Sequence, residues 1–108
     1  MNNVMEIEPQ ALVEAMNDHE EKPFLIDCRE PWEYEIARIE GATLIPMSRI
    51  PQSLELIPRN ATVVVYCHHG TRSLNVTGWL RQRGIETQSL KGGIDRWSLE
   101  VDPAVPRY

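Results

Sequence analysis

Residues 63–73 read VVVYCHHGTRS, and the rest of the chain can be laid out around this stretch. Its first four residues are β-branched or aromatic, which predicts a buried strand. A cysteine follows the strand, then a few polar residues and Gly70, and the segment from Ser73 onward has the apolar spacing of a helix. The sequence therefore predicts a strand, a tight loop and a helix start, with Cys67 at the first position of the loop.

The predicted loop has the features of an anion site. Gly70 suits a turn with positive φ, and main-chain N–H groups that curl around one centre at a helix start favour negative charge. A cysteine sulfur held there is expected to ionise well below the ~8.5 of a free thiol, and Arg72 can offer a planar fork of donors to an oxyanion. We therefore predict that Cys67 is a nucleophile. The residues predicted to form its anion seat are His68, His69, Gly70, Thr71 and Arg72.

Four segments, in order along the chain, resemble motifs of the rhodanese (thiosulfate sulfurtransferase) family. Residues 67–73 resemble its active-site loop, and the match extends from about Phe24 to Trp97. One segment departs from the family pattern, because residues 38–42 read RIEGA where His-x-Pro-Gly-Ala is usual, which leaves the shape of that loop and the contact of the absent histidine open. The other matching segments are DCRE at 27–30 with WEY at 32–34, GA at 41–42 through IP at 45–46, and LKGGIDRW at 90–97.

The resemblance implies sulfur transfer. Thiolate Cys67 would take a sulfane sulfur from thiosulfate or a protein persulfide, and the resulting persulfide would pass it to a thiol, a sulfur-carrier protein or cyanide. Asp27 and Arg29 would support the floor of the site. No cofactor is expected.

Two alternatives to sulfur transfer are considered. One is a non-catalytic rhodanese module that docks a protein partner. The other is a phosphatase or arsenate reductase, but the phosphatase relatives have five residues between cysteine and arginine and this chain has four, His68 to Thr71. The tighter loop favours a single sulfur atom over a tetrahedral phosphoryl group.

Bulk properties fit one soluble domain spanning residues 1–108. Hydrophobic residues make up 42% and charged residues 25% of the 108, which is ordinary globular composition. The longest apolar run, residues 63–67, is far shorter than the ~20 residues of a membrane span. A net charge of -5 argues against a nucleic-acid partner. Residues 1–6 lack the pattern of a secretory signal, so we expect a cytoplasmic protein and no membrane contact.

The second cysteine and the paired histidines have simpler interpretations than a disulfide or a metal site. Cys28 ends another strand pattern and could lie beside Cys67, but we expect a small buried core residue rather than a disulfide partner. His68 and His69 are adjacent on an extended loop, where side chains diverge, and no separate Cys/His pair has zinc-site spacing. We therefore expect solvent-facing histidines and no metal.

Strand and helix patterns alternate along the chain, which predicts an α/β domain with a parallel sheet of about five strands and helices on both faces. Residues 101–108 contain two prolines and are expected to form an extended C-terminal tail on the surface. This tail resembles those of rhodanese domains attached to enzymes that adenylylate sulfur-carrier proteins. The predicted strands are 5–7, 24–28, 42–45, 63–67 and 85–90. The predicted helices are 10–17, 31–36, 49–56, 73–83 and a short one after Gly93, and Pro51 limits the helix at 49–56 to starting near its own position.

Overall fold

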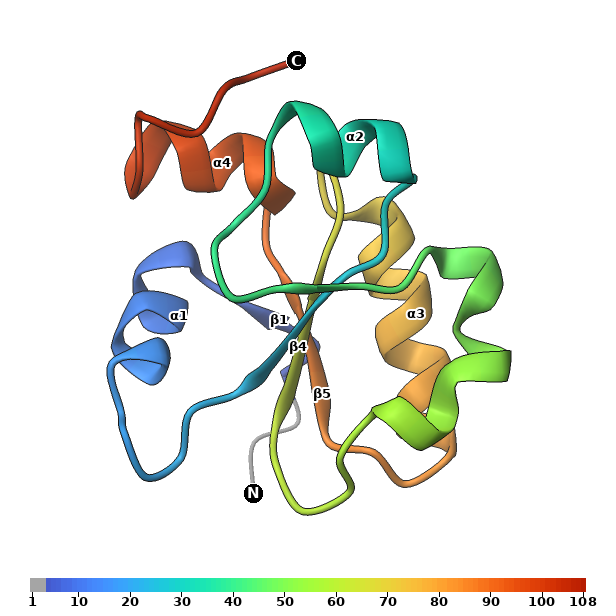
Figure 1. Ribbon diagram of the computed structural model, residues 1–108. Helices are drawn as coiled ribbons and strands as arrows, with labels where there is room; N and C mark the ends of the chain where they lie inside the picture. Colours follow the sequence, from blue (N-terminus) through green and yellow to red (C-terminus); the bar gives the residue numbers. More distant parts are fainter. Residues whose placement is uncertain (1–3) are drawn as a thin grey trace.

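The computed structural model describes residues 4–108, so residues 1–3 of the predicted domain lie outside the described part. It confirms the predicted α/β fold, with a five-stranded parallel sheet and helices on both faces (Figure 1). The elements, in chain order, are β1 (Glu6–Ile7), α1 (Pro9–Met16), β2 (Phe24–Asp27), α2 (Pro31–Ile36), β3 (Thr43–Leu44), the 3₁₀ helices η1 (Met47–Arg49) and η2 (Pro51–Leu56), β4 (Val63–Tyr66), α3 (Thr71–Gln82), β5 (Thr87–Leu90) and α4 (Gly93–Glu100).

Strand β4 lies at the centre of the sheet, whose strand order is β1-β5-β4-β2-β3. All four of its residues are buried, as expected for a central parallel strand covered on both faces. Helices α1 and α4 lie on one side of the sheet, and α3 and the two 3₁₀ helices lie on the other (Figure 1). The loop after β4 therefore opens at the carboxyl edge of the sheet, between two helical layers.

Alternation of side chains along β2 and β4 assigns each residue to one helical layer. Ile26 and Val65 pack in the core beneath α3, together with Cys28 and Cys67, the residues directly after the two strands. The side chain of Tyr66 points to the other face of the sheet, and it packs in the core beneath α1 and α4. Both cysteine side chains consequently belong to the same layer of the core.

The segment predicted as one helix over 49–56 forms two 3₁₀ helices instead. The N–H of Ile50 donates to Met47 O at 3.3 Å and the N–H of Ser53 to Ile50 O at 3.0 Å, the i to i+3 pattern of a 3₁₀ helix. Pro51 is the first residue of η2 and has no N–H to donate to an earlier carbonyl. The second helix therefore begins at Pro51, the position to which the proline was expected to limit the start of the helix.

The C-terminal tail, predicted to be extended on the surface, turns back onto the domain. The N–H of Val105 donates to Asp102 O at 3.0 Å, and the hydroxyl of Ser98 donates to Val105 O at 2.6 Å. Val105 is buried against the core beneath α1 and α4. The apolar side chain anchors a segment that its two prolines keep out of a helix.

The first turn of α4 is hydrogen-bonded to the loop after β4. The N–H of Ile94 donates to Cys67 O at 2.9 Å and the N–H of Asp95 to His68 O at 3.1 Å, so these free N–H groups of the first helical turn take up the loop carbonyls. Gly93 has φ 63° and sits so close that a Cβ atom would overlap the His68 carbonyl group and the Cys67 oxygen. Only glycine fits this position without moving the loop.

We predict that Gly93→Ala destabilises the domain by about 2 kcal/mol or more, because the new Cβ must displace main-chain atoms at a left-handed φ. Gly84→Ala is the matched control. Gly84 has φ 80° with no atom within 4 Å of the added Cβ, so its cost is limited to about 1 kcal/mol of backbone strain. Urea unfolding of both variants measures the difference, and equal losses would contradict the proposed close contact.

Candidate active site

The sulfur of Cys67 is enclosed by donors of its own loop. The residue is 1% exposed, and its Sγ accepts hydrogen bonds from the N–H of Gly70 at 3.1 Å and the N–H of Ser73 at 3.4 Å. Gly70 has φ 114°, which turns the loop back over the sulfur. Thr71 then begins α3 and is exposed. Two main-chain donors therefore converge on the cysteine predicted to be the nucleophile.

Ser73 is a site residue that the sequence analysis quoted but did not select. Its hydroxyl lies 3.4 Å from Cys67 Sγ, 3.2 Å from Gly70 O and 2.7 Å from the hydroxyl of Ser89 on β5. Ser73 and Ser89 are fully buried. The serine therefore braces the turn at Gly70 and keeps a polar group beside the sulfur.

These contacts favour the thiolate of Cys67. A hydrogen bond from the Cys28 thiol is the largest influence, and the Ser73 hydroxyl and the N–H groups of Ser73 and Gly70 add to it. Together they outweigh burial, which acts in the opposite direction, and lower the pKa of the Cys67 thiol to about 5. Near neutral pH the sulfur is a buried anion.

Arg72 lies next to the loop, and its guanidinium fork is bound to a carboxylate. Its two terminal nitrogens donate to the oxygens of Glu33 at 2.8 and 2.9 Å. The side chain of Glu33 is 4% exposed and that of Arg72 is 32% exposed. The fork predicted to face an oxyanion is thus engaged in a bidentate ion pair that joins the loop to α2.

Glu33 is a second site residue that the sequence analysis missed. Besides pairing with Arg72, its carboxylate accepts hydrogen bonds from the main-chain N–H of Glu30 at 3.0 Å and from the hydroxyl of Tyr108 at 2.7 Å. The ion pair with Arg72, and after it these hydrogen bonds, lower the pKa of the Glu33 carboxyl to about 2. Its spacing of three residues after Glu30 is a capping-box signal, but a helix cap alone does not predict a partner on α3.

Asp27 and Arg29, the two predicted supporting residues, form a buried ion pair. Nε of Arg29 donates to Asp27 Oδ1 at 2.8 Å and Nη2 donates to Oδ2 at 2.6 Å, with both side chains 0% exposed. Arg29 also donates to the carbonyl of Ala37 and to the hydroxyl of Tyr108 at 2.7 Å. The pair thereby ties the end of β2 to the residue after α2 and to the tail.

The aromatic rings beside the loop form a stack. The rings of His68 and Tyr108 are parallel at 4.0 Å between centroids, and those of His68 and His69 stack at the same distance. The prediction that both histidines face solvent is wrong for His68, which is only partly exposed and whose Nε2 is buried without a partner among the described residues. Burial and the neighbouring His69 lower the pKa of the His68 imidazole. Tyr108, assigned to a surface tail, is part of the site wall.

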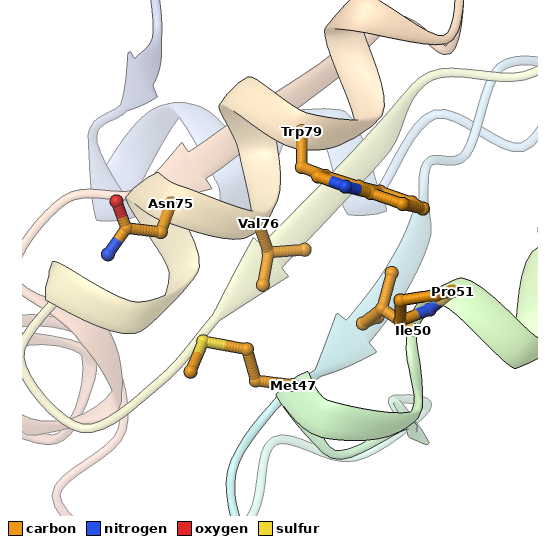
Figure 2. A pocket seen from close by; sticks show the side chains of 6 residues that line it. All are labelled: Met47, Ile50, Pro51, Asn75, Val76 and Trp79. Atoms are coloured by element: carbon orange, nitrogen blue, oxygen red, sulfur yellow. The ribbon is translucent and has the colours of Figure 1, made fainter.

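A separate apolar hollow lies between α3 and the 3₁₀ helices, on the same side of the sheet as Cys67. Figure 2 shows Met47 and Ile50 facing Val76 and Trp79 across it. Its volume is about 190 Å³. The lining residues are Met47, Ile50, Pro51, Asn75, Val76 and Trp79.

Comparison with known proteins identifies the family. The sequence profile described as "Rhodanese-like domain" matches residues 8–100. The chain belongs to the rhodanese-like family. Another member, named "Sulfurtransferase", from Allochromatium vinosum, is 35% identical over 103 residues, covering 94% of this chain and 95% of that protein.

Other rhodanese-like relatives are longer or known as structures. The "Probable adenylyltransferase/sulfurtransferase MoeZ" of Mycobacterium tuberculosis is 36% identical over 94 residues, and this chain spans 24% of its length. The crystal structure of a rhodanese-related protein from Thermoplasma volcanium matches with a TM-score of 0.83 and 28% identity, over 95% of this chain and 98% of that one. The fold of this rhodanese-like domain is therefore that of its family.

Residues 4–108 of the rhodanese-like domain contain neither a cluster of metal ligands nor a membrane-spanning helix. No three His, Cys, Asp or Glu side chains in this range are grouped so that they could hold a metal ion. None of its helices is long and apolar enough to cross a bilayer.

We predict that Glu33→Gln destabilises the domain by about 1–3 kcal/mol near neutral pH, because Arg72 loses its charged partner. The lowered pKa of Glu33, about 2 against an ordinary 4.5, means that its contribution is complete above 4.5 and is lost as the pH falls towards 2. The difference in unfolding free energy between wild type and variant should therefore shrink over that interval. A difference that stays constant on acidification would contradict the assigned ion pair.

We predict that Tyr108→Phe destabilises the domain by about 1–2 kcal/mol, because the phenol hydroxyl joins Arg29 to Glu33 in a partly buried position. Tyr34→Phe is the matched control, since the hydroxyl of Tyr34 bonds to no other described residue, and its effect should stay within about 0.5 kcal/mol. Thermal unfolding compares the two. Similar effects of both substitutions would show that the Tyr108 hydroxyl does not brace the site.

Proposed function

We propose that this rhodanese-like domain is a sulfurtransferase that carries a sulfane sulfur as a persulfide on Cys67. The observation that carries the proposal is the sulfur of Cys67, which is 1% exposed and accepts the N–H groups of Gly70 and Ser73. A thiolate in this setting attacks without a general base, because its proton is already lost near neutral pH. The name of the A. vinosum relative supports the same reaction class.

The first step is a displacement at the outer sulfur of thiosulfate or of a protein persulfide. The Cys67 thiolate forms a bond to that sulfur, the bond from it to the donor breaks, and sulfite or the donor thiolate leaves with the electron pair. The product is a persulfide on Cys67. Main-chain N–H groups of the loop provide donors for the anionic outer sulfur until an acceptor attacks it.

The loop supports sulfur transfer over phosphate or arsenate chemistry. Four residues separate Cys67 from Arg72, one fewer than in the phosphatase relatives. Both oxygens of Glu33 occupy the Arg72 fork, at 2.8 and 2.9 Å, and a phosphoryl group would have to displace them to use the same donors. A single anionic sulfur needs no such rearrangement.

We propose a thiol or a sulfur-carrier protein as the acceptor, with cyanide as a substitute in the assay. The relative MoeZ combines the words adenylyltransferase and sulfurtransferase in its name, which favours a carrier protein. The proposed setting is the cytoplasm, because the reaction requires Cys67 as a free thiol and reducing compartments maintain thiols.

We predict that Cys67→Ser abolishes thiosulfate:cyanide sulfurtransferase activity while the circular dichroism spectrum stays that of the wild type. Mass spectrometry of the wild type after brief thiosulfate treatment should find about 32 Da added at Cys67 and none at Cys28, the mass of one sulfur. Activity that persists in Cys67→Ser would contradict the proposal.

The pH profile gives a second readout. Because the pKa of Cys67 is about 5, the rate of persulfide formation should rise through that pH and be flat by neutrality. A rate that still climbs through the range of an ordinary thiol would contradict the stabilised thiolate.

A further inference from the structure

The thiol of Cys28 lies directly beside the sulfur of Cys67. Strands β2 and β4 pair in register with Asp27 opposite Tyr66, so Cys28 and Cys67 are the next pair along. The pairing continues to this point, since the N–H of Cys28 donates to Tyr66 O at 3.0 Å. Both side chains pack in the core layer beneath α3, and both are free thiols.

The spacing of the two strands suits a disulfide between Cys28 and Cys67. Neighbouring parallel strands lie about 4.8 Å apart, inside the roughly 4.4–6.8 Å between Cα atoms that disulfides require. The Cys28 thiol is the largest influence on the pKa of the Cys67 thiol, which it lowers. Cys28 is 0% and Cys67 1% exposed, so both thiols are buried side by side in the core.

The groups beside the Cys67 sulfur come from two separate segments of the chain. Gly70 and Ser73, from the loop above the carboxyl edge of the sheet, point their N–H groups at the sulfur. Cys28 reaches it from the end of β2. Displacement at sulfur requires an attacking thiolate opposite the leaving group, so the proposed step requires the sulfane sulfur to be seated among the loop donors and away from Cys28.

We propose that Cys28 is a resolving thiol, which displaces the sulfane sulfur from the Cys67 persulfide as hydrosulfide and closes a Cys28–Cys67 disulfide. This step deepens the proposed function, because it starts from the persulfide of that reaction. It gives the domain a second outcome for bound sulfur, release as sulfide, when no acceptor collects it.

The step balances without an external oxidant. The Cys28 sulfur bonds to the Cys67 sulfur, the bond between Cys67 and the outer sulfur breaks, and the Cys28 proton leaves on the outer sulfur as HS⁻. The sulfane sulfur is reduced to sulfide, and the two cysteine sulfurs are oxidised to the disulfide. A thiol reductant then reopens the disulfide and returns both cysteines to the starting state.

Resting and loaded states differ in the reactivity of Cys28. In the resting state the hydrogen bond to the Cys67 thiolate, and after it burial, raise the pKa of the Cys28 thiol, so Cys28 stays protonated. In the persulfide the inner sulfur is covalently bonded and the charge lies on the outer sulfur, so the largest influence holding the Cys28 proton is removed. Loading Cys67 therefore activates its neighbour.

The negative charge on the outer sulfur of the persulfide makes release of sulfide slower than transfer of that sulfur to an acceptor. While the loop donors hold the outer sulfur as an anion, it can leave only as a sulfide dianion, which is a poor leaving group until the Cys28 proton reaches it. An external acceptor attacks the outer sulfur itself and has no such requirement. Transfer of the outer sulfur to an acceptor is therefore faster than its release as sulfide. Release dominates only when no acceptor is present.

The test follows loaded protein under anaerobic conditions with no acceptor present. Wild type and Cys28→Ser are loaded with thiosulfate and, separately, with inorganic polysulfide, which adds sulfur to thiolates without depending on the proposed donor specificity. Released sulfide and the intact mass of each protein are measured over time. Cys28→Ser keeps a hydrogen-bond donor at the position but has no thiol, and Cys28→Ala serves if the serine variant fails to fold.

For the wild type we expect loss of the added mass of about 32 Da, release of about one sulfide per chain, and a final mass about 2 Da below that of the reduced protein. In Cys28→Ser the added mass should persist and the rate of sulfide release should fall at least about tenfold. Equal persistence in wild type and variant would overturn the proposal. If thiosulfate adds no sulfur to either protein, the proposed use of thiosulfate as donor fails, and polysulfide loading still decides the role of Cys28.

Discussion

A negative charge on a sulfur that is 1% exposed is the constraint on which the rest of this structure depends. Burial alone would keep Cys67 protonated, so every stabilising contact must come from the protein. The N–H groups come from Gly70 in the loop and Ser73 in the first turn of α3, the Cys28 thiol comes from the residue after β2, and the Ser73 hydroxyl adds a further polar contact. These groups come from segments far apart in the sequence, and only the assembled sheet brings them together around one atom.

The fold was largely predictable because parallel βα units have strong local signals. The continuous apolar run of β4 and the helical spacing after it locate the centre of the sheet and α3. Prediction failed where one residue outweighed a pattern. Residues 47–56 form two 3₁₀ helices, the second beginning at Pro51, and Val105, which lies between two prolines, folds the tail onto the core.

The candidate site was predictable only in its contiguous part. A cysteine, a turn glycine and an arginine within six residues indicate an anion loop, and the structure places them so that the loop closes on the sulfur. The partners that hold this loop come from elsewhere. The sequence around Glu33 predicts only a helix cap, and Tyr108 lies in the predicted tail. Both side chains nevertheless belong to one hydrogen-bond network with Arg29 and Arg72. Such long-range pairing depends on the crossing of elements in space and has no local pattern.

The clamp on the loop by the first turn of α4 has a consequence for how this family can diversify. The N–H groups of Ile94 and Asp95 fix the carbonyls of Cys67 and His68, and Gly93 leaves no spare room behind them. An inserted residue that widened the cradle for a bulkier oxyanion would break this register. Sequence changes in the loop and around Gly93 must therefore be acquired jointly, and laboratory evolution towards larger substrates should recover paired mutations in these two segments.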